Sequence, residues 1–170
     1  MKKYFLLILL VLLFGGYALN QFINVPKETH MHAGFQVYVD DKLQDFSDIK
    51  YMSIKPCKDD DHQKKTKEEI QDEKAHLHDE VGDVVHSHRE GGTWGDLFKN
   101  IDFKIDSSKE VKGYIDGNEV TDIFRESIKP YQSVVILIGS HANPDSYLEK
   151  RVKKERIVET EKKSEDCGVN

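Results

Sequence analysis

Six of the eight histidines in this 170-residue chain stand in three His-x-His pairs. The pairs are His30/His32, His76/His78 and His86/His88. In a β-strand, residues i and i+2 point to the same face about 7 Å apart, so two imidazoles at this spacing can chelate one ion. A single pair is weak information, because surface histidines also occur at this spacing. Three pairs in one small chain predict a metal-binding site.

A turn between the second and third pairs would bring them face to face. The turn is expected near Val81-Gly82-Asp83. Asp79 lies beside the second pair, and we expect it either to bind the ion or to orient a histidine that does. The first pair would complete the site from across the sheet. The predicted metal ligands are therefore His30, His32, His76, His78, Asp79, His86 and His88.

The donor set limits the choice of ion. Four imidazoles satisfy a tetrahedral ion, and six could hold two ions or leave some rings in a supporting role. Imidazole with carboxylate favours zinc or copper, with nickel or iron as further candidates. No cysteine lies among the histidine pairs, which excludes a zinc-finger-like thiolate site, although Cys57 could still reach in as a soft ligand.

Two other interpretations of the histidines stay open. Clustered neutral histidines gain charge near pH 6 and repel one another, so the cluster could be a pH sensor without any metal. Three histidines that leave a position open for water could instead form a catalytic centre. The nearest candidate bases are Glu80 and Glu90, and nothing marks either one. The chain carries no glycine-rich phosphate loop or nucleophile elbow, so neither nucleotide nor acyl chemistry is supported.

The charge balance excludes another class of partner. The chain has 25 basic and 31 acidic residues, a formal net charge of −6. Nucleic acid is bound by a basic face, so no nucleic-acid partner is expected. An acidic surface suits a cation, and the sequence identifies no protein partner.

The N-terminus predicts export. Lys2 and Lys3 precede an uncharged, leucine-rich run, and residues 4–23 would span about 30 Å as a helix. We expect a signal anchor that leaves the N-terminus in the cytoplasm. This would make a single-pass protein of the cell membrane whose C-terminal domain lies outside the cytoplasm. A signal peptide cleaved near Gly16-Tyr17-Ala18 and a secreted product are the alternative.

Periodicity predicts the elements that position the histidines. Strands are expected at residues 33–39, 43–46, 50–54, 81–88, 111–115, 119–123 and 134–138. The last of these is the most apolar and should be central. Thr93 and Asp96 form a capping box that opens a short helix through Asn100. The Asp116-Gly117 sequence favours a tight hairpin turn.

The order of hairpin, helix, hairpin and strand predicts an α+β fold. We expect a small mixed β-sheet with one short helix packed on it, similar to the β-grasp arrangement and preceded by an N-terminal transmembrane helix. The expected organisation is an anchor at 1–23, a linker at 24–29, a histidine-rich domain at 30–145 with a charged insert at 58–74, and a charged tail at 146–170. Cys57 and Cys167 either form a disulfide or remain as two free thiols.

The segment from His76 to Phe98 resembles the central motif of an uncharacterised family of short exported or membrane-anchored prokaryotic proteins. The shared features are His76-x-His78-Asp79, Gly82, Val84-Val85, His86 and the helix start Thr93-x-Gly95-x-Leu97-Phe98. The likeness extends over residues 30–139. It implies that the histidines occur together, and it implies no activity.

The sequence therefore predicts a membrane-tethered domain outside the cytoplasm. It would capture, buffer or deliver a transition-metal ion through its His-x-His pairs. A metal-dependent enzyme of unknown substrate and a metal-free adhesion or assembly module are the alternatives, and the residues favour binding over catalysis.

Overall fold

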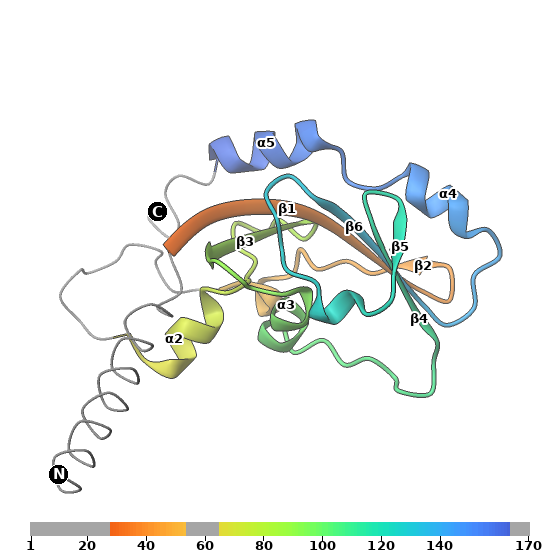
Figure 1. The fold of residues 1–170 in the computed structure, drawn as a ribbon, viewed down its shortest axis with the longest axis horizontal. Coiled ribbons are helices and arrows are strands. Elements are labelled where there is room, and N and C mark those ends of the chain that lie inside the picture. The colour runs from red at the N-terminus through yellow and green to blue at the C-terminus, as the bar shows by residue number, and fades with distance from the viewer. Residues whose placement is uncertain (1–27, 54–64, 164–170) are drawn as a thin grey trace, which may run out of the picture.

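The longest strand, β1 (Glu28–Val39), organises a six-stranded mixed sheet. The computed structural model describes residues 28–53 and 65–163, coloured in Figure 1. The main strand order is β2-β1-β6-β4-β5, and β3 (Val84–Arg89) pairs with the N-terminal half of β1. Apolar residues alternate along β1, so that Ala33, Phe35 and Val37 are all buried on one face.

Two tight hairpins flank the centre of the sheet. In the first, Asp40 and Asp41 have φ values of 46° and 66° and connect β1 to β2 (Lys42–Leu43). In the second, Asp116 and Gly117 have φ values of 51° and 90° between β4 (Val111–Ile115) and β5 (Asn118–Val120). Positive φ at both central residues matches the twist of the strands, which is why Asp and Gly occupy these turns.

The central strand is β6 (Ser133–Ile138), as its apolar sequence predicted. All six of its residues are buried. It runs parallel to β1 on one side and antiparallel to β4 on the other. A strand covered on both faces needs apolar side chains in both directions, and Val134 to Ile138 supply them.

One face of the sheet packs against α3 (Trp94–Asn100). Thr93 caps this helix, and its hydroxyl and the Asp96 carboxylate form the predicted capping box. Trp94, Leu97 and Phe98 are buried in the same core cluster as the inward side chains of β1 and β6. Trp94, Phe98 and Ile136 are all buried. The shorter helix α2 (Lys67–Asp72) lies beside α3 on this side of the sheet (Figure 1).

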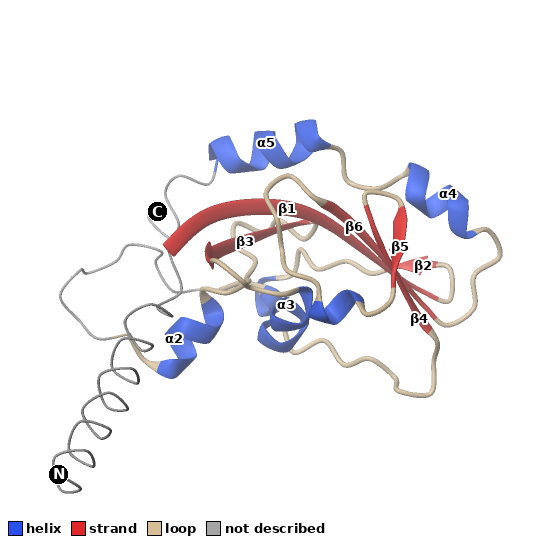
Figure 2. Cartoon of the chain, viewed as in Figure 1, coloured by secondary structure: helices blue, strands red, loops and turns tan. Residues whose placement is uncertain are grey.

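The other face is covered by α4 (Pro144–Glu149) and α5 (Lys154–Lys163), as Figure 2 shows. The helix α5 packs on β1 through Ile157. This packing depends on Gly34, because a Cβ there would lie 2.5 Å from the Cβ of Val152. The absent side chain therefore lets the chain entering α5 approach the sheet closely.

The predicted fold class needs correction in its helices. The described residues contain four α-helices rather than one short helix. None of the helices in residues 28–53 and 65–163 is long and apolar enough to cross a membrane. The expected transmembrane helix at 4–23 lies outside the described residues, as do Cys57 and Cys167. The C-terminal segment, expected to be a charged tail, docks on the sheet through Val152 and Ile157 of the chain that enters and forms α5.

Several predicted strand boundaries were also wrong. The segment predicted as a strand at 50–54 contains a 3-10 helix at Ile49–Tyr51, because the Asp48 carboxylate accepts a hydrogen bond from the Lys50 amide. The return strand expected at 43–46 is reduced to Lys42–Leu43. The strand expected from residue 81 begins at Val84, since Asp79 and Glu80 form a turn with positive φ. A short 3-10 helix, η2 (Ile123–Arg125), follows β5.

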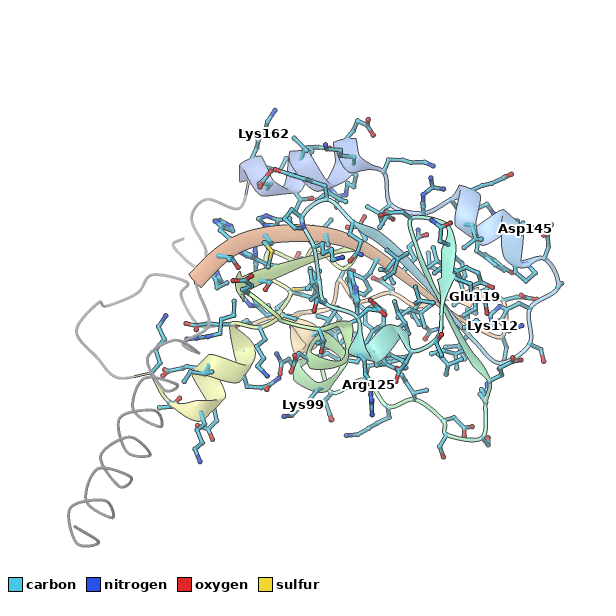
Figure 3. All side chains as sticks on the ribbon, in the orientation of Figure 1. Lys99, Lys112, Glu119, Arg125, Asp145 and Lys162 are labelled. Atoms are coloured by element: carbon cyan, nitrogen blue, oxygen red, sulfur yellow. The ribbon has the colours of Figure 1, made fainter. Side chains whose placement is uncertain are left out.

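Charged side chains lie on the outside of this layered arrangement. Figure 3 labels six of them, which are all exposed: Lys99, Lys112, Glu119, Arg125, Asp145 and Lys162. Four histidines in the part of the chain that the structure describes behave differently and are buried: His32, His76, His78 and His86.

Truncation of the central strand should be costly. Ile136 is fully buried, so Ile136→Ala should lower the free energy of unfolding by about 2–5 kcal/mol, because it leaves a cavity. Denaturant unfolding measures this change. The control is Ile49→Ala, whose side chain is 63% exposed and whose loss should change stability by no more than about 0.5 kcal/mol. Equal effects of the two substitutions would contradict this account of the core.

Candidate metal centre

The three histidine pairs lie on three neighbouring segments of the sheet. β3 is the middle one, with β1 on one side and the segment containing His76 on the other. His32 stands opposite His86 in the register of β1 with β3. His76 also stands opposite His86, and each donates its backbone N–H to the other's carbonyl oxygen at 2.9 Å. One row of histidines therefore crosses all three segments.

All three pairs point to the same face of the sheet. Their neighbours Ala33, Leu77 and Val85 are buried in the core beneath α3. Because side chains alternate between faces, the histidines point to the opposite side, toward α5. Val84, two residues before His86, packs with Val152 and Ile157 on that side.

His86 is the centre of a cluster that includes all six rings. Its ring centroid lies 4.4–5.0 Å from those of His30, His32, His76, His78 and His88. His32 and His30 stack on it at interplanar angles of 24° and 22°. The expected face-to-face arrangement of the second and third pairs is present, with the first pair beside them.

Two groups of three histidines in the described residues could hold a metal ion. The inner triad consists of His76, His78 and His86, and the outer triad consists of His30, His32 and His86. Within each triad, one nitrogen from each ring lies within 4.8 Å of the other two. Ligands about 2.0–2.1 Å from a common zinc ion stand at most about 4 Å apart, so small side-chain adjustments would suffice for binding.

Hydrogen bonds fix the ring protons of the inner triad. The Nδ1 of His76 lies 3.0 Å from the backbone oxygen of Asp72, and the Nδ1 of His78 lies 2.7 Å from Oδ2 of Asp79. A carbonyl or a carboxylate oxygen can only accept, so both Nδ1 atoms carry the proton. Each ring therefore directs its lone pair through Nε2, as a metal ligand requires. The Nε2 of His78 faces the Nδ1 of His86 in close contact.

Burial favours the neutral form of His76. All three members of the inner triad are buried, as is His32, while His30 is exposed. Burial lowers the pKa of His76, the neighbouring His78 and His88 lower it further, and the Asp72 carboxylate and carbonyl oppose the shift. Neutral imidazole is the form that binds metal.

The other predicted residues take different places. Asp79 belongs to neither triad and instead orients His78. Asp83 forms an ion pair with Arg156 at 3.0 Å. The ring of His88 lies in the cluster, where its Nε2 is buried without a hydrogen-bond partner in the part of the chain that the structure describes. His141 lies outside the cluster, with its Nδ1 at 3.2 Å from Oδ1 of Asp41. His62 and Cys57 lie outside the described residues.

Sequence reasoning missed one residue at the edge of the site. Glu161, on α5, places Oε1 at 3.8 Å from the Nδ1 of His32. The hydroxyl of Tyr131 donates to the Oε2 of Glu161 at 2.9 Å and holds the carboxylate there. Glu161 lies in a lysine- and glutamate-rich segment, and the burial of Ile157 and Thr160 distinguishes the inner side of that helix.

No protein-family model, curated protein or solved structure matches this chain. The resemblance of residues 76–98 to a family of exported proteins therefore stays a prediction.

The metal-free protein should become less stable as the pH falls. The usual pKa of histidine is 6.5, and that of His76 is lower in the folded chain. Below pH 6.5 the unfolded chain takes up a proton that folded His76 does not, so the free energy of unfolding decreases with falling pH. Urea unfolding in the presence of a chelator, at several pH values between 7.5 and 5, measures the slope. His76→Gln should reduce this slope, and an unchanged slope would show that His76 does not contribute.

Proposed function

We propose that this protein binds a transition-metal ion at its histidine cluster and so captures, buffers or delivers that ion. The observation that carries the proposal is the convergence of three His-x-His pairs on one face of the sheet, where the distant first pair lies beside the second and third. An ion at either triad would be bound by one nitrogen from each of three rings.

The surroundings of the rings support metal binding over a simple histidine core. Histidines with a purely structural role need hydrogen bonds, but their lone pairs need not point to a common position. Here the Nδ1 atoms of His76 and His78 each lie beside an oxygen acceptor, so the lone pair of each ring is on Nε2. Both rings belong to the inner triad. A carboxylate that holds a ligating histidine by its other nitrogen is a frequent support of metal sites.

The donor set favours zinc or copper, with nickel or iron as further candidates. Three neutral imidazoles with a nearby carboxylate match the preferences of these borderline ions. Calcium and magnesium prefer oxygen ligands and do not fit a triad of nitrogens.

Removal of the central ring should abolish tight binding. The full chain, purified without a histidine tag, is equilibrated with zinc or copper, and the bound metal is measured by elemental analysis. His86→Ala should weaken the affinity at least about 100-fold, because His86 belongs to both triads. His141→Ala is the matched control, since it removes a buried histidine side chain outside the cluster and should leave binding unchanged. A wild-type protein that takes up no transition metal would contradict the proposed function.

The aspartate that orients His78 should also affect affinity. Asp79→Asn replaces a carboxylate by an amide and loses the charge-assisted hydrogen bond to Nδ1, which should weaken metal binding about 10–100-fold. Asp83→Asn is the control, because Asp83 lies nearby in the sequence and pairs with Arg156 instead of a histidine. Titration against a competing chromophoric chelator gives both affinities. Equal effects of the two substitutions would show that Asp79 does not support the site.

A further inference from the structure

We infer that the cluster holds two metal ions side by side, with His86 as a ligand to both. This inference rests on the proposed function and extends it. The inner ion would be bound by His76, His78 and His86, and the outer ion by His30, His32 and His86.

The two triads are separate positions that have one ring in common. Nitrogens lie within 4.8 Å of one another inside each triad, and His86 is the only residue that belongs to both. The Nδ1 of His86 faces the Nε2 of His78, so Nδ1 serves the inner position. The two nitrogens of an imidazole lie on different sides of the ring, which leaves Nε2 for the outer position.

Binding at both nitrogens requires the loss of one proton. Neutral His86 carries a hydrogen on one of its nitrogens, and a bridging imidazolate carries none. The proton would pass to solvent when the second ion binds. The ring then carries a negative charge between two cations, which reduces their repulsion.

Each triad also has a carboxylate of its own. Asp79 lies 2.7 Å from the Nδ1 of His78 in the inner triad, and Glu161 lies 3.8 Å from the Nδ1 of His32 in the outer one. Two divalent ions that share one imidazole ring repel each other strongly. A negative charge beside each ion lowers the free energy needed to bind both. A single ion would not need carboxylates on both sides of the cluster.

The two positions differ in their access to solvent. All three inner histidines are buried, whereas His30 of the outer triad is exposed. The outer ion would therefore lie nearer to solution than the inner ion. This difference suits a protein that takes up an ion at the surface and retains it inside.

The test counts ions in the full, untagged chain and in three variants. At saturating zinc, elemental analysis should find two equivalents in the wild type and in His141→Ala. It should find one in His30→Ala, which removes the exposed ligand of the outer position, and one in His78→Ala, which removes an inner ligand. Far-UV circular dichroism checks that the variants are folded. His30 is exposed, so its variant remains informative if His78→Ala unfolds.

A second measurement tests the shared ring. With copper(II), the first equivalent should give the electron paramagnetic resonance spectrum of an isolated ion. The second equivalent should produce magnetic coupling between the two ions, with release of a proton in excess of that seen for the first. Two bound ions without coupling would overturn the shared role of His86.

The results also separate this inference from the proposed function. One equivalent in the wild type would overturn the two-ion inference and leave metal binding intact. Two equivalents in both the wild type and His30→Ala would overturn the outer position. No bound metal in any form of the protein would overturn both.

Discussion

The register of β3 between its two neighbours is the constraint on which the candidate site depends. His86 stands opposite His32 on one side and opposite His76 on the other. Because side chains alternate with a period of two, a slip of one residue would turn the histidines of β3 toward the core under α3. The burial of Val85 in the core, beside Ala33 and Leu77 of the neighbouring segments, prevents this slip, since Val85 would then leave the core. The core and the histidine cluster thus specify the same register.

Local chemistry in the sequence was enough to predict several elements and the set of candidate ligands. The capping box at Thr93, the Asp116-Gly117 turn and the apolar strand at Val134 to Ile138 depend on neighbouring residues, and each occurs as expected. The His-x-His spacing similarly indicated which side chains share a face. That a metal ion binds them, and the resemblance to a family of exported proteins, stay predictions.

Contacts between distant segments could not be predicted in the same way. The docking of α5 depends on the fit of Val152 and Ile157 against Gly34, which neither composition nor periodicity reveals. Glu161 reaches the site only through that docking. The short helix at Ile49–Tyr51 replaced an expected strand, because a single aspartate side chain caps it. The number of helices in the described residues was underestimated because helices such as α5 depend on contacts with distant segments.

The proposed metal binding would link metal supply to the lifetime of the folded chain, because the candidate ligands lie on three segments that only folding brings together. An unfolded chain has no preformed site, so an ion that occupies the cluster binds the folded state alone and adds its binding free energy to folding. A cell short of the metal would then hold a larger unfolded fraction, which proteases remove first. The abundance of the protein would follow the availability of its ion without any separate sensor.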